Sequence, residues 1–154
     1  MEENQKKYSV EDSNWRDIHS LRHLEKVCFT DDAWPLSDLM GVLLFPGVVR
    51  LKAVAEGELI GFIAGDPRNS LKIGWILTLG VLPEWRRMGI AQALLSECES
   101  RLKMDKIKLT VRRGNDSAIR LYEKLGYRQV NIWRKYYRNG EDGLVLEKEM
   151  EAKI

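Results

Sequence analysis

The chain of 154 residues has few of the residue types from which metal and disulfide sites are built. It contains two cysteines and two histidines. His19 and His23 stand at a helical spacing that can hold a metal, but there is no further histidine to complete such a site. Cys28 and Cys98 fall on apolar helix faces, which predicts buried free thiols rather than a disulfide. We therefore expect a protein without a bound metal.

Long apolar runs and a strong net charge are also absent. No run approaches the roughly 20 apolar residues that cross a bilayer. Residues 1–7 are polar and lack the apolar core of a secretory signal. The net charge of +2 is too small, and Lys and Arg are too dispersed, to indicate a nucleic-acid partner. We therefore expect a cytoplasmic protein that binds neither a membrane nor a nucleic acid.

The composition that remains is that of an ordinary globular protein, with 44% hydrophobic and 31% charged residues. Residues 1–154 are expected to form a single domain, since no linker or repeat interrupts them. The apolar patterns predict strands at 8–10, 48–55, 59–65, 73–81, 106–111, 128–136 and 144–150, and helices at 15–28, 36–45, 91–102 and 116–125. This order predicts an α/β (α+β) fold, in which a mixed, largely antiparallel sheet has helices on both faces.

The most informative segment joins the strand 73–81 to the helix 91–102 through a turn. The first turn of a helix has free backbone N–H groups and the positive end of the helix dipole, which attract phosphate. Arg86 and Arg87 add positive charge there, and Gly89 lets a ligand approach the backbone closely. A pyrophosphate is the expected ligand. The chain has no Gly-Lys-Ser/Thr and no Gly-x-Gly-x-x-Gly, which excludes a nucleoside triphosphate and a dinucleotide.

A second block follows the predicted strand 106–111. Asn115 offers an N-cap side chain to a helix whose apolar face includes Tyr122. Gly126 is expected to end that helix in a left-handed conformation, and Tyr127 to pack back onto its last turn.

Together the two blocks resemble the motifs of the GNAT superfamily of N-acyltransferases. The motifs are Arg86-x-x-Gly89-x-Ala91, similar to the superfamily's acyl-CoA pyrophosphate signature, and Asn115-x-x-Ala118-x-x-Leu121-Tyr122-x-x-x-Gly126-Tyr127. Two further segments resemble the ribosomal-protein-alanine N-acetyltransferase branch: Cys28-Phe29 before Trp34-Pro35, and Arg134-Lys135-Tyr136-Tyr137 before Gly140-Glu141-Asp142. The resemblance implies a GNAT-like acyl-CoA N-acyltransferase fold, acetyl-CoA as co-substrate and an amine acceptor. It also implies strands that splay apart at Leu79 and Lys108 to admit the pantetheine arm.

The resemblance also implies roles for individual residues. Tyr122 matches the tyrosine that protonates the CoA thiolate, and is the expected general acid. The expected acetyl-CoA contacts are Leu79, Gly80, Val81, Arg86, Arg87, Met88, Gly89, Ile90, Ala91, Gln92, Asn115 and Tyr122. The expected substrate contacts are Asp32, Trp34, Thr110, Tyr136 and Tyr137, with Trp34 the one tryptophan expected to contact substrate. The oligomeric state stays open between monomer and homodimer.

Residues 79–81 also suggest how the acetyl carbonyl is polarised. A bulge or splay there would leave backbone N–H groups unpaired, free to hold the pantetheine and donate to the acetyl carbonyl. Gly80 is expected to make this distortion easy.

The general base is where the sequence departs from the ribosomal-protein-alanine branch. A glutamate commonly stands at the second position of its Leu-x-Val-Arg strand, but this chain has Thr110 there. Threonine is no useful base; it could hold a relay water, and Glu84 and Asp32 remain candidate carboxylates. Deprotonating a lysine, with pKa ~10.4, costs roughly 3 kcal/mol more than deprotonating an α-amine, with pKa ~8.

A weakened base therefore favours a protein N-terminal α-amine as the acceptor. The alternatives are an acetyltransferase for a lysine or a small-molecule amine, and a catalytically silent acyl-CoA-binding module. The presence of Tyr122 argues against the silent module.

Overall fold

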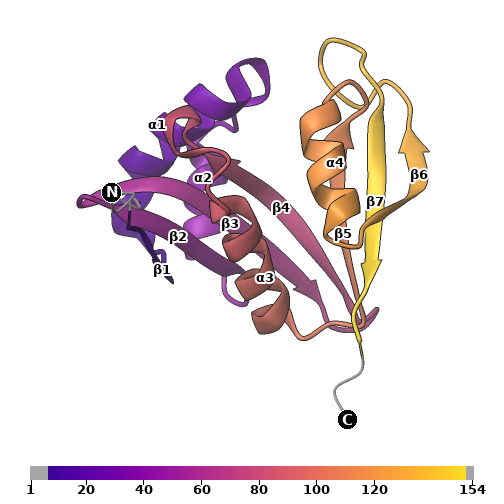
Figure 1. Ribbon diagram of the computed structural model, residues 1–154, viewed down its shortest axis with the longest axis horizontal. Helices are drawn as coiled ribbons and strands as arrows, with labels where there is room; N and C mark the ends of the chain where they lie inside the picture. The colour runs from indigo at the N-terminus through magenta and orange to yellow at the C-terminus, as the bar shows by residue number, and fades with distance from the viewer. Residues whose placement is uncertain (1–6, 152–154) are drawn as a thin grey trace, which may run out of the picture.

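The structure, a computed structural model, describes residues 7–151, which form one sheet flanked by helices. The strands are β1 (Ser9–Asp12), β2 (Val49–Ala55), β3 (Glu58–Arg68), β4 (Ile73–Val81), β5 (Lys106–Arg112), β6 (Arg128–Trp133) and β7 (Gly143–Glu149). Their order in the seven-stranded sheet is β1-β2-β3-β4-β5-β7-β6, and each neighbouring pair is antiparallel except β4 and β5. This confirms the expected mixed, largely antiparallel sheet (Figure 1).

Helices cover both faces of this sheet, as expected. The α-helices are α1 (Ile18–Phe29), α2 (Leu36–Leu44), α3 (Ile90–Leu102) and α4 (Asp116–Lys124), and the 3₁₀ turns are η1 (Trp15–Asp17), η2 (Thr30–Asp32) and η3 (Pro83–Trp85). A side chain at Gly61 would meet α3, whereas a side chain at Gly80 would meet α1. Gly80 pairs with Phe62, the residue after Gly61, so the two glycines face opposite sides of the sheet. Helix α4 lies over β5 (Figure 1). Within residues 7–151, no helix combines the length and apolar character needed to cross a membrane.

The core lies between these helices and the sheet. Its largest fully buried side chains come from α1, α2, α3 and the central strands: Phe62, Leu21, Leu24, Leu39, Leu51, Ile60, Ile63, Ile90, Leu94, Leu95, Ile107 and Leu146. The predicted helical and strand patterns therefore place their apolar residues inward.

The largest differences from the predicted strand ends are in β6 and β3. β6 stops at Trp133 rather than 136, because Lys135 has a left-handed backbone (φ 51°) and its N–H donates to Asp142 Oδ1 at 3.0 Å. β3 extends beyond the predicted Gly65, and Pro67 lies opposite Gly74 of β4. Both differences come from contacts across the connection that follows the strand, which the apolar pattern of the strand itself does not contain.

The β4–β5 pair is open along most of its length. The strands are in register only where Ile73–Trp75 lies beside Lys106–Lys108. Beyond Trp75, β4 keeps its antiparallel partner β3 but separates from β5, and the two ribbons diverge in Figure 1. The expected splay of these strands is confirmed.

The distortion of β4 is not where the glycine predicted it. The register with β3 shifts between the pairs Thr78–Ala64 and Ile76–Gly65, so the bulge falls at Leu77. Gly80 is in regular register with Phe62, so of the bulge or splay expected at residues 79–81 the splay from β5 is present and the bulge is not. A Cβ at Gly80 would lie 3.3 Å from the Cys28 sulfur and 3.4 Å from the Phe29 ring. The glycine therefore makes room for α1 against β4.

Candidate active site

A cavity of about 810 Å³ occupies the opening between β4 and β5. It contains eight of the predicted site residues: Asp32, Trp34, Leu79, Thr110, Asn115, Tyr122, Tyr136 and Tyr137. The other predicted acetyl-CoA contacts, Gly80, Val81 and residues 86–92, do not line it. The predicted set therefore divides between a turn at the start of α3 and the cavity. The turn is here called the donor end. The mouth of the cavity around Asp32 and Tyr137 is here called the acceptor end.

The donor end is shaped by backbone conformation. Arg87 (φ 62°) and Gly89 (φ 79°) are both left-handed, and Gly89 is the N-cap residue of α3. No side chain of the described residues caps this helix. The first N–H groups of α3 are therefore left for a ligand, and the helix dipole favours an anionic one.

Arg86 takes a position that the sequence did not suggest. Its Nε donates to the carbonyl of Val81 at 2.9 Å, and its Nη2 lies 3.8 Å from the sulfur of Cys28. The side chain therefore ties the end of β4 to α1, whereas Arg87 is exposed beside the first turn of α3. Cys28 is half-buried and Cys98 is buried, and both are free thiols, as expected.

Tyr122 lies on α4 and reaches the cavity from the β5 side. The helix begins with Asn115 Oδ1 accepting from the Ala118 N–H at 3.3 Å, and the left-handed Gly126 (φ 98°) follows it, both as predicted. The Tyr122 ring makes an edge contact with Tyr127, at 5.9 Å between centroids. Its hydroxyl makes no hydrogen bond within residues 7–151, and burial raises the pKa of Tyr122 to about 12. The phenol is therefore protonated at neutral pH and free to donate.

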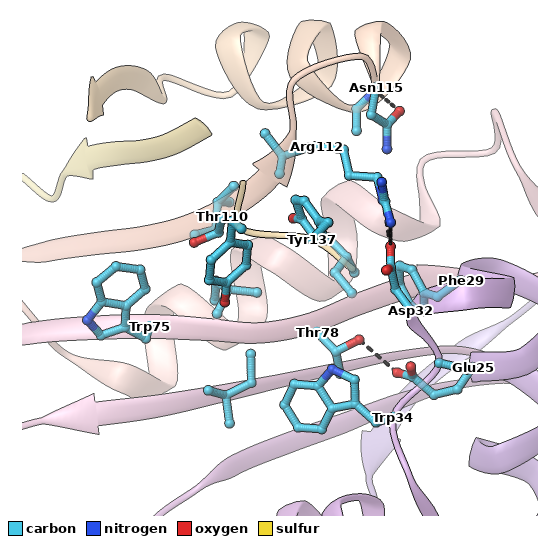
Figure 2. Close-up of a pocket in the computed structure, with 18 of the residues that line it drawn as sticks. Glu25, Phe29, Asp32, Trp34, Trp75, Thr78, Thr110, Arg112, Asn115 and Tyr137 are labelled. Carbon is cyan, nitrogen blue, oxygen red and sulfur yellow. Dashed lines mark hydrogen bonds and ion pairs between the residues drawn. The ribbon is translucent and has the colours of Figure 1, made fainter. Parts of the chain in front are cut away.

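The acceptor end is crossed by a charged network centred on Arg112. Its guanidinium pairs with Asp32 on one side, and with Glu141 (2.9 Å) and Asn139 (3.0 Å) on the other. It also stacks over the Tyr137 ring, 4.2 Å from the centroid. Figure 2 shows Arg112 reaching from β5 to Asp32. Sequence reasoning missed Arg112, because Asp32 is 80 residues away along the chain and Glu141 is 29.

Aromatic side chains form the wall next to this network. Trp75 and Trp133 stack, with centroids 5.7 Å apart, and Trp133 contacts Tyr136 at 5.2 Å. Both tryptophans line the cavity together with Trp34. Sequence reasoning singled out Trp34, whereas β4 and β6 bring two further tryptophans to the same cavity.

The carboxylates named as candidate bases are poorly placed for that role. Glu84 is exposed on η3 and does not line the cavity, and Asp32 is engaged with Arg112. Thr110 lines the cavity from β5 but carries no basic group.

Sequence reasoning missed a third carboxylate, Glu25 of α1. It is 1% exposed and accepts a hydrogen bond from Thr78 Oγ1 at 2.8 Å. It stands next to Leu24 in an apolar helix pattern, and the sequence held no sign that it points inward.

The start of α3 has no side-chain cap, and the strands β4 and β5 splay apart around a cavity that contains Tyr122. Together with the family match, these features define the class of the protein: an acetyl-CoA-dependent N-acetyltransferase. The chain belongs to the Acetyltransferase (GNAT) family, which residues 14–127 match.

The relatives and solved structures agree with this membership. The chain is 27% identical to an N-alpha-acetyltransferase of Sulfurisphaera tokodaii, with 92% of each chain covered. Its fold is similar to that of the ribosomal-protein-S18-alanine N-acetyltransferase from Escherichia coli, with a TM-score of 0.86, 21% identity and 96% and 97% of the two chains covered. It is also similar to Arabidopsis thaliana NAA60 in complex with acetyl-CoA, with a TM-score of 0.81, 25% identity and 95% and 100% covered.

Proposed function

We propose that the protein transfers an acetyl group from acetyl-CoA to the N-terminal α-amine of a protein or peptide, with Tyr122 as the general acid. The observation that carries this proposal is that the opening between β4 and β5 holds the Tyr122 hydroxyl without a partner among the described residues. The S. tokodaii relative is an N-alpha-acetyltransferase whose alignment covers 92% of this chain, and it supports the acceptor class.

Each chemical step has a group in the cleft to serve it. The neutral amine attacks the acetyl carbonyl, a C–N bond forms, and negative charge develops on the carbonyl oxygen. Backbone N–H groups of β4 beyond Trp75 have no β5 partner, so they are available to stabilise that oxyanion. As the C–S bond breaks, the Tyr122 hydroxyl donates its proton to the departing thiolate.

Binding of the donor uses the turn at the start of α3. The residues that would hold the pyrophosphate are Arg87, Met88, Gly89 and the first turn of α3, through backbone N–H groups and the helix dipole. Arg86 supports this turn through Val81 and Cys28. The pantetheine would follow β4 from Val81 to Leu79 into the cavity, where Asn115 and Tyr122 lie.

The preference for an α-amine follows from proton chemistry. An α-ammonium has a pKa of ~8 and a lysine ammonium a pKa of ~10.4. At pH 7 the neutral fraction of an α-amine therefore exceeds that of a lysine amine by over ~100-fold. A cleft without a strongly basic group at Thr110 favours the amine that loses its proton more easily.

An acceptor panel with acetyl-CoA tests the proposal, using free thiol release as the readout. One peptide carries a free α-amine and no lysine, and its matched twin has a formylated terminus and a single lysine. We expect kcat/KM to be larger by about 100-fold for the α-amine peptide at pH 7. Equal rates on the lysine peptide, or a preference for a polyamine or aminoglycoside, would overturn the acceptor assignment. Acetyl-CoA binding without free-thiol release, whichever amine is supplied, would favour a catalytically silent acyl-CoA-binding module.

A further inference from the structure

Glu25 is a buried carboxylate with one oxygen unused. Its Oε1 accepts the hydrogen bond from Thr78, whereas Oε2 is buried and has no hydrogen-bond partner in the described chain. An unpaired buried carboxylate oxygen is costly, and a helix that only needed to pack would place an apolar side chain there. Glu25 also lines the cavity, below Asp32 and beside Trp34 in the view of Figure 2.

The surroundings of Glu25 leave its charge uncompensated. It makes no ion pair within residues 7–151. The charged side chains of the same cavity are Asp32 of η2, Asp38 of α2, Arg68 of β3, Arg112 of β5 and Arg138 of the β6–β7 connection. The other titratable groups are the Cys28 thiol one turn along α1, and the phenols of Tyr122, Tyr136 and Tyr137.

These surroundings favour the protonated carboxyl. Burial raises the pKa of Glu25, while the hydrogen bond from Thr78 and the nearby backbone amide of Trp34 offset part of the rise. Arg112, the cation of the acceptor-end network, is already shared between Asp32 and Glu141. A carboxyl group shifted toward neutral pH is suited to proton transfer with an amine.

We infer that Glu25 is the general base of the acetyl transfer, with its carboxylate receiving the proton of the acceptor ammonium through water in the cavity, and with Thr78 positioning the carboxylate. This inference rests on the proposed transfer to an α-amine and supplies the base that Thr110 does not.

The proton balance is complete without a further reactant. The ammonium R–NH₃⁺ loses one proton to Glu25, which becomes a neutral carboxylic acid. The amine attacks the acetyl carbonyl, the C–S bond breaks and Tyr122 protonates the thiolate. The second proton of the nitrogen returns to the Tyr122 oxygen through water, and Glu25 releases its proton to solvent after the product leaves.

A raised pKa at Glu25 also fits the choice of acceptor. Raising the pKa of Glu25 makes proton transfer from either ammonium less uphill. The transfer from an α-ammonium of pKa ~8 is easier than that from a lysine ammonium of pKa ~10.4 by more than two pKa units. The base and the acceptor class are therefore matched.

The test compares Glu25→Gln with Glu99→Gln in acetylation of the α-amine peptide from pH 6 to 9. The glutamine side chain of Glu25→Gln keeps the shape and can still accept from Thr78, but takes up no proton. We expect kcat/KM to fall about 10²-fold or more at low pH. In the wild-type enzyme, kcat/KM should stop rising with pH above the pKa of Glu25. In the variant, kcat/KM should instead rise with the fraction of neutral amine. The ratio of wild-type to variant kcat/KM should therefore shrink about tenfold per pH unit up to pH ~8.

Glu99 is the matched control because it is also a buried carboxylate, 6% exposed, but lies outside the cavity. It accepts from the Tyr127 hydroxyl at 2.8 Å and pairs with Lys148 at 3.1 Å. Glu99→Gln should lower the melting temperature and leave the shape of the pH profile unchanged. Glu25→Asp should recover part of the lost rate.

Thr78→Val provides a second measurement in case Glu25→Gln does not fold. Loss of the hydrogen bond that favours the charged carboxylate should raise the pKa of Glu25 and move the acid limb to higher pH, and Thr78→Ser should restore the limb. A Glu25→Gln enzyme with wild-type rate and pH profile, or an acid limb unmoved in Thr78→Val, would overturn the inference. Activity of the wild-type enzyme on the α-amine peptide is scored first, so a failure of the proposed function is seen separately.

Discussion

The donor end and the acceptor end of the cleft are built in different ways. The donor end is formed by one contiguous segment from β4 to α3 and is shaped by its backbone conformation. Gly89 is left-handed, and no described side chain caps α3. At the acceptor end, Arg112 joins Asp32 and Glu141, which come from separate parts of the chain. The donor end therefore depends on local backbone geometry, and the acceptor end on side chains that only the fold brings together.

This difference suits two ligands of different variability. A pyrophosphate presents the same oxygens in each reaction cycle, and fixed N–H groups at a helix start are an adequate partner for it. An acceptor varies in its side chains, and a cavity lined by exchangeable aromatic and charged residues can be retuned without moving the backbone. Substitutions should therefore affect donor binding at one end and acceptor binding at the other.

The largest expected effect is at Gly89. Gly89→Val places a β-branched residue at φ 79° and puts a side chain where the donor phosphates would approach. We expect acetyl-CoA affinity, measured by calorimetry, to fall about 10²-fold or more, since loss of one or two hydrogen bonds to a charged group costs ~3 kcal/mol. Gly57→Val is the control, because Gly57 has φ 75° in the β2–β3 turn, does not line the cavity, and also has open space around it. Similar affinity losses in both variants would contradict a donor site at α3.

Tyr122→Phe should break the chemistry while leaving both ends intact. The ring and its contact with Tyr127 remain, but the proton for the thiolate is lost. We expect turnover to fall about 10²-fold or more, with acetyl-CoA affinity unchanged. Tyr127→Phe is the paired control, since its hydroxyl bonds to Glu99 rather than facing the cavity, and should cost ~1–3 kcal/mol of stability with normal turnover. Undiminished turnover in Tyr122→Phe would return that tyrosine to a packing role.

A smaller effect is expected at Arg112. Arg112→Gln removes the cation that Asp32, Glu141 and the Tyr137 ring share. We expect the KM for the α-amine peptide to rise about tenfold, about 1.4 kcal/mol, without a change in acetyl-CoA affinity. Arg113→Gln removes the neighbouring exposed arginine, which pairs with Asp142 at 3.1 Å, and should have little effect. An equal loss of acetyl-CoA affinity in Arg112→Gln would mean that the two ends are not separable.

The same division explains what the sequence could predict. The elements of the donor end were predictable, because a strand end and a helix start stand within one short segment. The helix of Tyr122 was predictable for the same reason, from Asn115 at its start to Gly126 at its end. The left-handed backbone of Gly89 and the contacts of Arg86 with Val81 and Cys28 were not. The order of elements and the mixed sheet followed from apolar periodicity.

The rest depended on contacts that no local pattern contains. Gly80 looked like a site of strand distortion, but it serves close packing against Cys28 and Phe29 of α1. Arg112 and Glu25 looked like ordinary strand and helix residues, because their partners are far away in the sequence. The predicted Tyr122 and Thr110 were found in the cavity, but the buried carboxylate of Glu25, which lines the same cavity, was not predicted.

The central claim is that one cleft holds a CoA pyrophosphate at the donor end and an α-amine at the acceptor end. The most direct test is the affinity, by calorimetry, of two bisubstrate analogues in which CoA is joined through an acetyl bridge to a peptide. One is linked at the α-nitrogen, and the other at a lysine ε-nitrogen of the same peptide with a blocked terminus. The account predicts that the α-linked analogue binds about 10²-fold or more tighter than CoA, while the lysine-linked analogue stays close to CoA. Equal or tighter binding of the lysine-linked analogue would contradict it.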